Sequence, residues 1–81
     1  MSYTKPHTFD KEVVQRISDY IEKNNLSLPK IASASGMPYQ RLYHLLYNSA
    51  LIKLREYVAL CETFHEPLDY FVKDIDWNFD E

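Results

Sequence analysis

Residues 28–46 read LPKIASASGMPYQRLYHLL, and a glycine followed two residues later by a proline divides this stretch into two short helical patterns. Gly36 is the one glycine in the 81-residue chain. Because glycine adopts a positive φ without steric penalty, its place between two apolar-periodic runs predicts a chain reversal. The stretch therefore predicts a helix-turn-helix, in which a tight turn sets the second helix at a steep angle to the first.

Apolar residues recur at helical spacing on both sides of this stretch and predict further helices. Together the expected helices cover about residues 10–23, 28–35, 39–47 and 54–64, and a short fifth helix begins at Pro67. In the fourth of them, the residues expected to face inward are Leu54, Tyr57, Val58, Cys61 and Phe64. No segment of strand period is long enough to pair. The sequence therefore predicts an all-α, compact five-helix domain.

Size and residue types argue against catalysis. A chain of 81 residues forms one domain, too small for a cleft backed by several layers. It has no glycine-rich phosphate loop, no convincing carboxylate pair and no cysteine–histidine pair with a third orienting group. His7, His44 and His65 lack metal-ligand spacing, and the single Cys61 is expected in the core. We expect no catalytic residue, no metal, no cofactor and no small-molecule substrate.

The charges are divided unevenly along the chain. Residues 1–55 hold eight Lys or Arg against four Asp or Glu, whereas residues 56–81 hold one base against eight acids. This division predicts a basic working face and an acidic far side, although acidic helices can also serve solubility alone. The sequence contains no apolar run of membrane-spanning length and no signal-peptide pattern near Met1. A cytoplasmic protein without membrane contact is expected.

The segment from about Val14 to Val72 resembles the phage-repressor and Cro (XRE-type) family of helix-turn-helix domains. The residues that carry this resemblance are LSLPKIASASGMPYQRLYHLLYN at 26–48 and LREYVALCETFHEPLDYFV at 54–72. The resemblance implies a lambda-repressor-like fold that binds double-stranded DNA sequence-specifically, usually as a homodimer, in a transcriptional regulator such as a repressor. It divides the chain into an N-terminal extension (1–9), the helix-turn-helix domain (10–73) and an acidic aromatic tail (74–81).

Four positions depart from the family pattern. Leu28 stands where the family commonly has a phosphate-bracing glutamine, and Ser35 stands where an apolar residue usually precedes the glycine. Pro38 replaces a side chain that could cap the recognition helix, and His65 replaces the usual glycine before the fifth helix. These changes leave the predicted fold intact, but the change at Leu28 removes one expected operator contact.

The helix expected at 39–47 would present its polar face to the major groove. Its candidate base-reading residues are Tyr39, Gln40, Tyr43 and His44. Glutamine can pair with adenine, histidine can donate to guanine, and tyrosine can reach phosphates or press on thymine methyl groups. Alternatively, either tyrosine could pack over the edge of the core. The candidate phosphate contacts are Lys30, Arg41, Asn48, Lys53 and Arg55.

A protein-interaction module on the same fold is the alternative function, comparable to an antirepressor or antitoxin that binds a protein partner. The tyrosines expected to be exposed or half-exposed, Tyr39, Tyr43, Tyr47 and Tyr57, would suit such a surface. The overall net charge of −3 also fits this alternative. For a DNA-binding dimer, the candidates for the dimer interface are the short fifth helix and the aromatic residues Trp77 and Phe79 of the tail.

Overall fold

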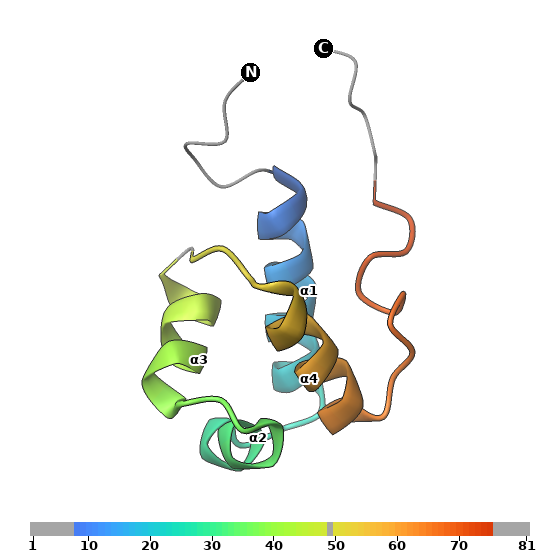
Figure 1. The fold of residues 1–81 in the computed structure, drawn as a ribbon. Coiled ribbons are helices and arrows are strands. Elements are labelled where there is room, and N and C mark those ends of the chain that lie inside the picture. The colour runs from blue at the N-terminus through green and yellow to red at the C-terminus, as the bar shows by residue number, and fades with distance from the viewer. Residues whose placement is uncertain (1–7, 49, 76–81) are drawn as a thin grey trace.

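The structure is a computed structural model that describes residues 8–48 and 50–75 (Figure 1). Its four helices are α1 (Thr8–Lys23), α2 (Leu28–Ser35), α3 (Tyr39–Tyr47) and α4 (Leu54–Phe64), and these described ranges contain no strand. The all-α prediction is therefore confirmed, and α1 begins two residues earlier than predicted. None of these helices is both long enough and apolar enough to cross a membrane.

The predicted fifth helix is wrong for the described residues. After α4 the chain forms consecutive turns over residues 68–74. The amide of Tyr70 bonds to the Pro67 carbonyl at 3.0 Å and that of Lys73 to the Asp69 carbonyl at 3.1 Å, so helical bonding starts but does not propagate. Asp74 then takes a positive φ of 63°. Side chains from α4 and α1 shape the segment instead, because Tyr57 donates to the Leu68 carbonyl and Arg16 donates to the Lys73 carbonyl.

The core lies where the four helices meet. The side chains with the least exposure include Ile17 of α1, Leu42 and Leu45 of α3, and Leu60 and Cys61 of α4. Helix α2 packs on α3 and α4, and α3 packs on α1. The expected inward position of Leu54 is wrong, because this first residue of α4 lies beyond the edge of the core and is 79% exposed.

The predicted turn at Gly36 is confirmed. Gly36 has φ 75° and ψ 17°, in the left-handed region, and its amide bonds to the carbonyl of Ser33 at 3.3 Å. The next amide, that of Met37, bonds to the carbonyl of Ala32 at 3.0 Å, which completes a Schellman motif. The Met37 side chain is buried in the core, so the turn is fixed by hydrogen bonds and by packing. Three residues therefore separate the end of α2 from the start of α3.

A second turn of the same kind ends α4, but here a histidine occupies the left-handed position. His65 has φ 60° and ψ 38°, and its amide bonds to the carbonyl of Glu62 at 3.1 Å. The amide of Glu66 bonds to the carbonyl of Cys61 at 3.0 Å. A side chain with a Cβ atom is strained in this conformation by roughly 1–2 kcal/mol. Since the His65 side chain is exposed, packing offers little compensation.

We therefore expect His65→Gly to raise the free energy of unfolding by about 0.5–1 kcal/mol. Glycine relieves the strain of the left-handed backbone, and the flexibility it adds to the unfolded chain offsets part of this gain. Urea denaturation with an unchanged m-value would measure the effect. The converse control is Gly36→Ala, where a Cβ atom would meet no heavy atom within 4 Å. This control isolates backbone strain and is expected to lose about 1 kcal/mol. Equal stability of the wild type and the His65 variant would contradict the strain assigned to this turn.

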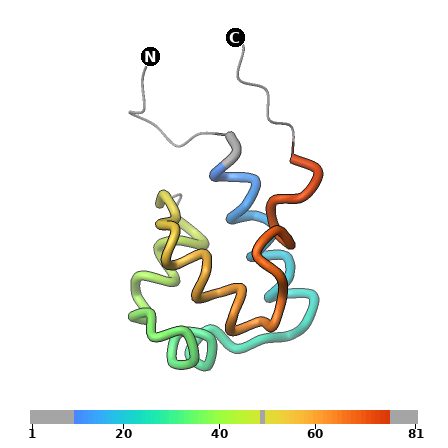
Figure 2. Tube along the Cα trace, turned by 45° about the vertical axis from the view of Figure 1, so that its right-hand side comes forward, coloured from blue at the N-terminus to red at the C-terminus, as the bar shows by residue number. Residues whose placement is uncertain are grey.

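The segment that follows α4, residues 66–75, runs back along α1 (Figure 2). The hydroxyl group of Tyr20 donates to Oε2 of Glu66 at 2.8 Å, and this bond is the main reason that the pKa of Tyr20 rises to about 12. The Tyr57 hydroxyl donates to the Leu68 carbonyl, and Arg16 donates to the Lys73 carbonyl. Phe71, which belongs to this segment, is buried in the core. The segment thus closes one side of the core.

Candidate nucleic-acid interface

One half of α3 is exposed, and it carries all four predicted base-reading residues. Tyr39 is 46% exposed and Tyr43 is 45% exposed, and Gln40 and His44 also belong to the exposed class. More than half of the surface of Tyr39 and of Tyr43 is covered, so the alternative expectation that one of these rings packs over the core edge stays a prediction. The structure therefore brings the four candidates together on one surface.

Tyr47 extends the two predicted tyrosines into a row along the helix. The ring centroids of Tyr39 and Tyr43 lie 6.4 Å apart, and those of Tyr43 and Tyr47 lie 4.9 Å apart. The spacing of four residues places these rings above one another on the same face. We call Tyr39, Tyr43 and Tyr47 the tyrosine row. Tyr47 is 54% exposed, so the row forms a continuous aromatic surface with wet hydroxyl groups.

The opposite half of α3 is fixed in the fold. Leu42 and Leu45 are fully buried, and Leu46 is partly buried against the same core. The apolar contacts with α1 and α2 leave little freedom for the helix to rotate about its axis. Helix α3 lies at one side of the molecule (Figure 1), and its exposed half therefore keeps a defined direction.

Arg41 connects α3 to the start of α4 through Glu56. Its Nε donates to Oε2 of Glu56 at 2.7 Å, and its Nη2 donates to Oε1 at 2.8 Å. The same Nη2 also donates to the carbonyl of Leu51 at 2.8 Å, and the Lys53 amide donates to Glu56 Oε1 at 2.9 Å. Glu56 is buried, at 9% exposure. This network holds α3, the α3–α4 loop and the first turn of α4 together.

The network shifts the pKa values of both partners in the direction that keeps them charged. The hydrogen bonds from Arg41 lower the pKa of Glu56, and the backbone amide of Lys53 adds to this effect, while burial opposes it. The hydrogen bonds to Glu56 raise the pKa of Arg41. Arg41 is a predicted phosphate contact, but in this structure its guanidinium group is already engaged by Glu56 and Leu51.

The other predicted phosphate contacts lie in different places. Lys53 and Arg55 are exposed at the start of α4, and Arg55 lines a hollow beside the α2–α3 turn, together with Gly36 and Pro38. Lys30 is also exposed, but it lines a hollow between α2 and the end of α4 that no residue of α3 borders. Asn48 donates from its side-chain amide to Nδ1 of His44 at 3.0 Å, and this bond leaves the ring proton of neutral His44 on Nε2.

The helices α2 and α3 and the loops beside them carry no acidic residue. The sequence has no Asp or Glu between residues 23 and 55, whereas this span has five Lys or Arg. Glu56, the first acid after this span, is neutralised by Arg41. An anionic ligand that approached the exposed half of α3 would therefore meet no repulsion from α2, α3 or the loops beside them, and the cations at the start of α4 would attract it.

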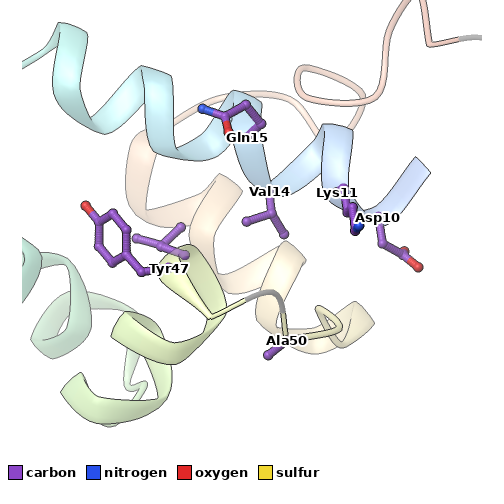
Figure 3. Close-up of a pocket in the computed structure, with 7 residues that line it drawn as sticks. Asp10, Lys11, Val14, Gln15, Tyr47 and Ala50 are labelled. Carbon is purple, nitrogen blue, oxygen red and sulfur yellow. The ribbon is translucent and has the colours of Figure 1, made fainter. Parts of the chain in front are cut away.

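A groove lies beside the C-terminal end of α3, between the first half of α1 and the loop after α3 (Figure 3). It has a volume of about 340 Å³. The lining includes Val14 and Gln15 from α1 and Tyr47 from α3, with Asp10 as its single carboxylate. One carboxylate without a partner provides neither an acid–base pair nor a nucleophile with its base. Within residues 8–48 and 50–75, no three His, Cys, Asp or Glu side chains group as metal ligands.

Comparisons with family models, with curated proteins and with solved structures each found no match to this chain. The function therefore has to be argued from the geometry of α3 and the charges around it.

Sequence reasoning missed two features of this interface. The Arg41–Glu56 pair is one, and the signal for it was weak: Glu56 stands three residues after Lys53, the spacing at which a glutamate bonds back to the amide that precedes a helix. The other is the place of Tyr47 in the tyrosine row: its exposure was expected, but it was not counted with Tyr39 and Tyr43 on the DNA-facing side, although its position eight residues after Tyr39 continues the same helix face. The expectation that Cys61 belongs to the core is confirmed, and burial raises the pKa of its thiol.

Proposed function

We propose that this chain is a sequence-specific DNA-binding transcriptional regulator that inserts α3 into the major groove of double-stranded DNA. The observation that supports this most is the division of α3 into two halves. One half is locked into the core through Leu42 and Leu45, and the other presents Tyr39, Gln40, Tyr43 and His44 to solvent. An α-helix with side chains fits the width of the major groove, and side chains near its N-terminus reach base edges.

The fold is proposed to be of the lambda-repressor, phage-repressor and Cro type. The support comes from the left-handed Gly36 turn between two short helices and from the packing of α2 on both α3 and α4. The turns at 68–74 occupy the place where that type would have its fifth helix. On this fold, Lys53 and Arg55 at the start of α4 would contact phosphates beside the exposed half of α3.

We further propose that the protein binds DNA as a homodimer and represses transcription in the cytoplasm. Regulators of this kind read two half-sites related by the symmetry of the dimer, which roughly doubles the contacts of one domain. The predicted dimer contribution of Trp77 and Phe79 lies outside the described residues. The resemblance of residues 14–72 to the phage-repressor and Cro family supports this part of the proposal. A single domain of this size also buries little surface on DNA, and a second copy would add to it.

The salt dependence of binding to duplex DNA tests the proposal. A dimer that neutralises about six phosphates is expected to lose roughly 10³-fold in affinity between 50 and 200 mM salt. Fluorescence anisotropy with a labelled duplex of mixed sequence would measure this slope. Arg55→Ala is expected to reduce the slope by about 1 for each subunit that contacts the duplex. The matched control is Lys73→Ala, which removes the same charge from the segment at 66–75 and is expected to leave the slope unchanged.

A protein-interaction module remains the second candidate function, and one observation favours it. Leu51 is 50% exposed and Leu54 is 79% exposed, and both lie just after α3, whose tyrosine row is also exposed. Exposed apolar patches mark protein interfaces, and tyrosine is enriched in them. If duplex binding were absent or did not respond to salt, DNA binding would be contradicted and a protein partner favoured.

A further inference from the structure

Arg41 is the one Lys or Arg on α3, and its engagement with Glu56 limits which bases this helix can read. The commonest specific contact in the major groove is an arginine or lysine that bonds to O6 and N7 of guanine. Arg41 would have to break two bonds to Glu56 and one to the Leu51 carbonyl to make such a contact. The release would also leave the buried Glu56 carboxylate without its partner.

The side chains that do remain on the exposed half match the edges of A·T pairs. Thymine carries a methyl group in the major groove, and apolar side-chain atoms recognise this group by contact. Tyr39 and Tyr43, in the first half of α3, offer two aromatic rings for such contacts. Gln40 is exposed next to them and can bond to N6 and N7 of adenine through both atoms of its amide.

His44 is compatible with this assignment. Because its Nδ1 accepts a bond from the Asn48 amide, the neutral ring offers the Nε2–H group as its outward donor. A single donor can bond to N7 of adenine or O4 of thymine as well as to guanine, so this group does not favour G·C pairs. The exposed half of α3 therefore combines two aromatic rings, one carboxamide and one imidazole donor.

We infer that α3 reads A·T pairs through thymine methyl groups and adenine edges, because its single guanidinium group is held inward by Glu56. This inference rests on the proposed function and narrows it to a class of DNA target. It assigns Tyr39 and Tyr43 to thymine methyl groups and Gln40 to adenine.

The test compares three duplexes of equal length at one fixed low salt concentration. The first is rich in A·T pairs, the second is rich in G·C pairs, and the third repeats the first with deoxyuridine in place of thymidine. The third duplex differs only by the absence of the thymine methyl groups. We expect the wild type to bind the A·T-rich duplex about tenfold more tightly than the G·C-rich one. We expect the wild type to bind the deoxyuridine duplex several-fold more weakly than the thymidine duplex.

Two variants of Tyr43 test whether its ring causes the preference for thymine over deoxyuridine. Tyr43→Phe keeps the ring and is expected to keep the preference for thymine over deoxyuridine. Tyr43→Ala removes the ring, and it is expected to bind the two duplexes with more similar affinity than the wild type does. A circular dichroism melt of both variants checks that the fold is retained, which is expected because Tyr43 is 45% exposed.

The results that would overturn the inference differ from those that would overturn the proposed function. Equal affinity for all three duplexes, or tighter binding to G·C, would overturn A·T reading while leaving DNA binding in place. A deoxyuridine effect that persists undiminished in Tyr43→Ala would assign the methyl preference to another contact or to DNA stiffness. Failure to bind any duplex in a salt-dependent way would overturn the proposed function itself.

Discussion

Replacement of Phe71 with alanine is expected to lower the free energy of unfolding by about 3–5 kcal/mol. Phe71 is 1% exposed, and its ring contacts aromatic rings from α1, from α4 and from its own segment. Its centroid lies 5.5 Å from that of Tyr20, 6.0 Å from that of Phe64 and 4.9 Å from that of Tyr70, all close to edge-to-face. Alanine would remove these contacts and leave a cavity that the rigid α1 and α4 cannot close.

The loss would consume much of the stability of a small domain, because native proteins of this size are stable by about 5–15 kcal/mol. Thermal unfolding followed by circular dichroism is expected to show a Tm lower by roughly 15–30 °C. Leu68→Ala is the matched control, since Leu68 lies in the same segment but is 56% exposed. Its expected effect is within about 0.5 kcal/mol.

A milder variant keeps this prediction testable if Phe71→Ala does not fold. Phe71→Leu retains most of the apolar volume and is expected to lose about 1–1.5 kcal/mol. A change of less than about 0.5 kcal/mol in both Phe71 variants would contradict the role of this ring. It would mean that the segment at 66–75 contributes little to the core, even though Tyr20 and Tyr57 bond to it.

The sequence predicted the four helices well because each carries its own local signals. Apolar periodicity placed the first helix, and the single glycine followed by Pro38 placed the turn between the second and third. Gly36 takes the left-handed conformation that its position predicted. The exposed half of α3 was predictable for the same reason, since Leu42 and Leu45 fix which side of the helix is buried.

The features that sequence reasoning missed depend on contacts between residues far apart in the chain. Leu54 has the periodicity of a core residue, but along α4 the core begins only one turn later, where Tyr57 packs against Phe71. The fifth helix was predicted from Pro67, from the apolar spacing after it and from the family resemblance, whereas bonds from Tyr57 and Arg16 hold that segment in turns. Arg41 has the sequence appearance of a free surface cation, and only the packing of α3 beside α4 reveals its partner.

Removal of Arg41 from its pair with Glu56 is expected to have the next largest effect on stability. Arg41→Met keeps most of the side-chain volume but leaves a carboxylate that is 9% exposed without its main partner. A fully buried unpaired charge costs about 3–5 kcal/mol, and since the Arg41 side chain is 29% exposed, we expect about 2–3 kcal/mol here. Chemical denaturation at pH 7 would measure this difference.

Glu56→Gln tests the same pair from the other side and makes its pH dependence measurable. Because Arg41 lowers the pKa of Glu56 in the folded state, the pair stabilises the fold above the ordinary glutamate pKa of about 4.3. This contribution is lost as the pH falls through the lower, folded-state pKa. The difference in unfolding free energy between the wild type and Glu56→Gln is therefore expected to be full at pH 7 and to shrink below about pH 4.

The double variant Arg41→Met with Glu56→Gln leaves no unpaired charge and is expected to lose less stability than the two single variants lose together. Additive losses and a gap that does not change with pH would show that the two groups act independently, and α3 would then be held by its leucines alone.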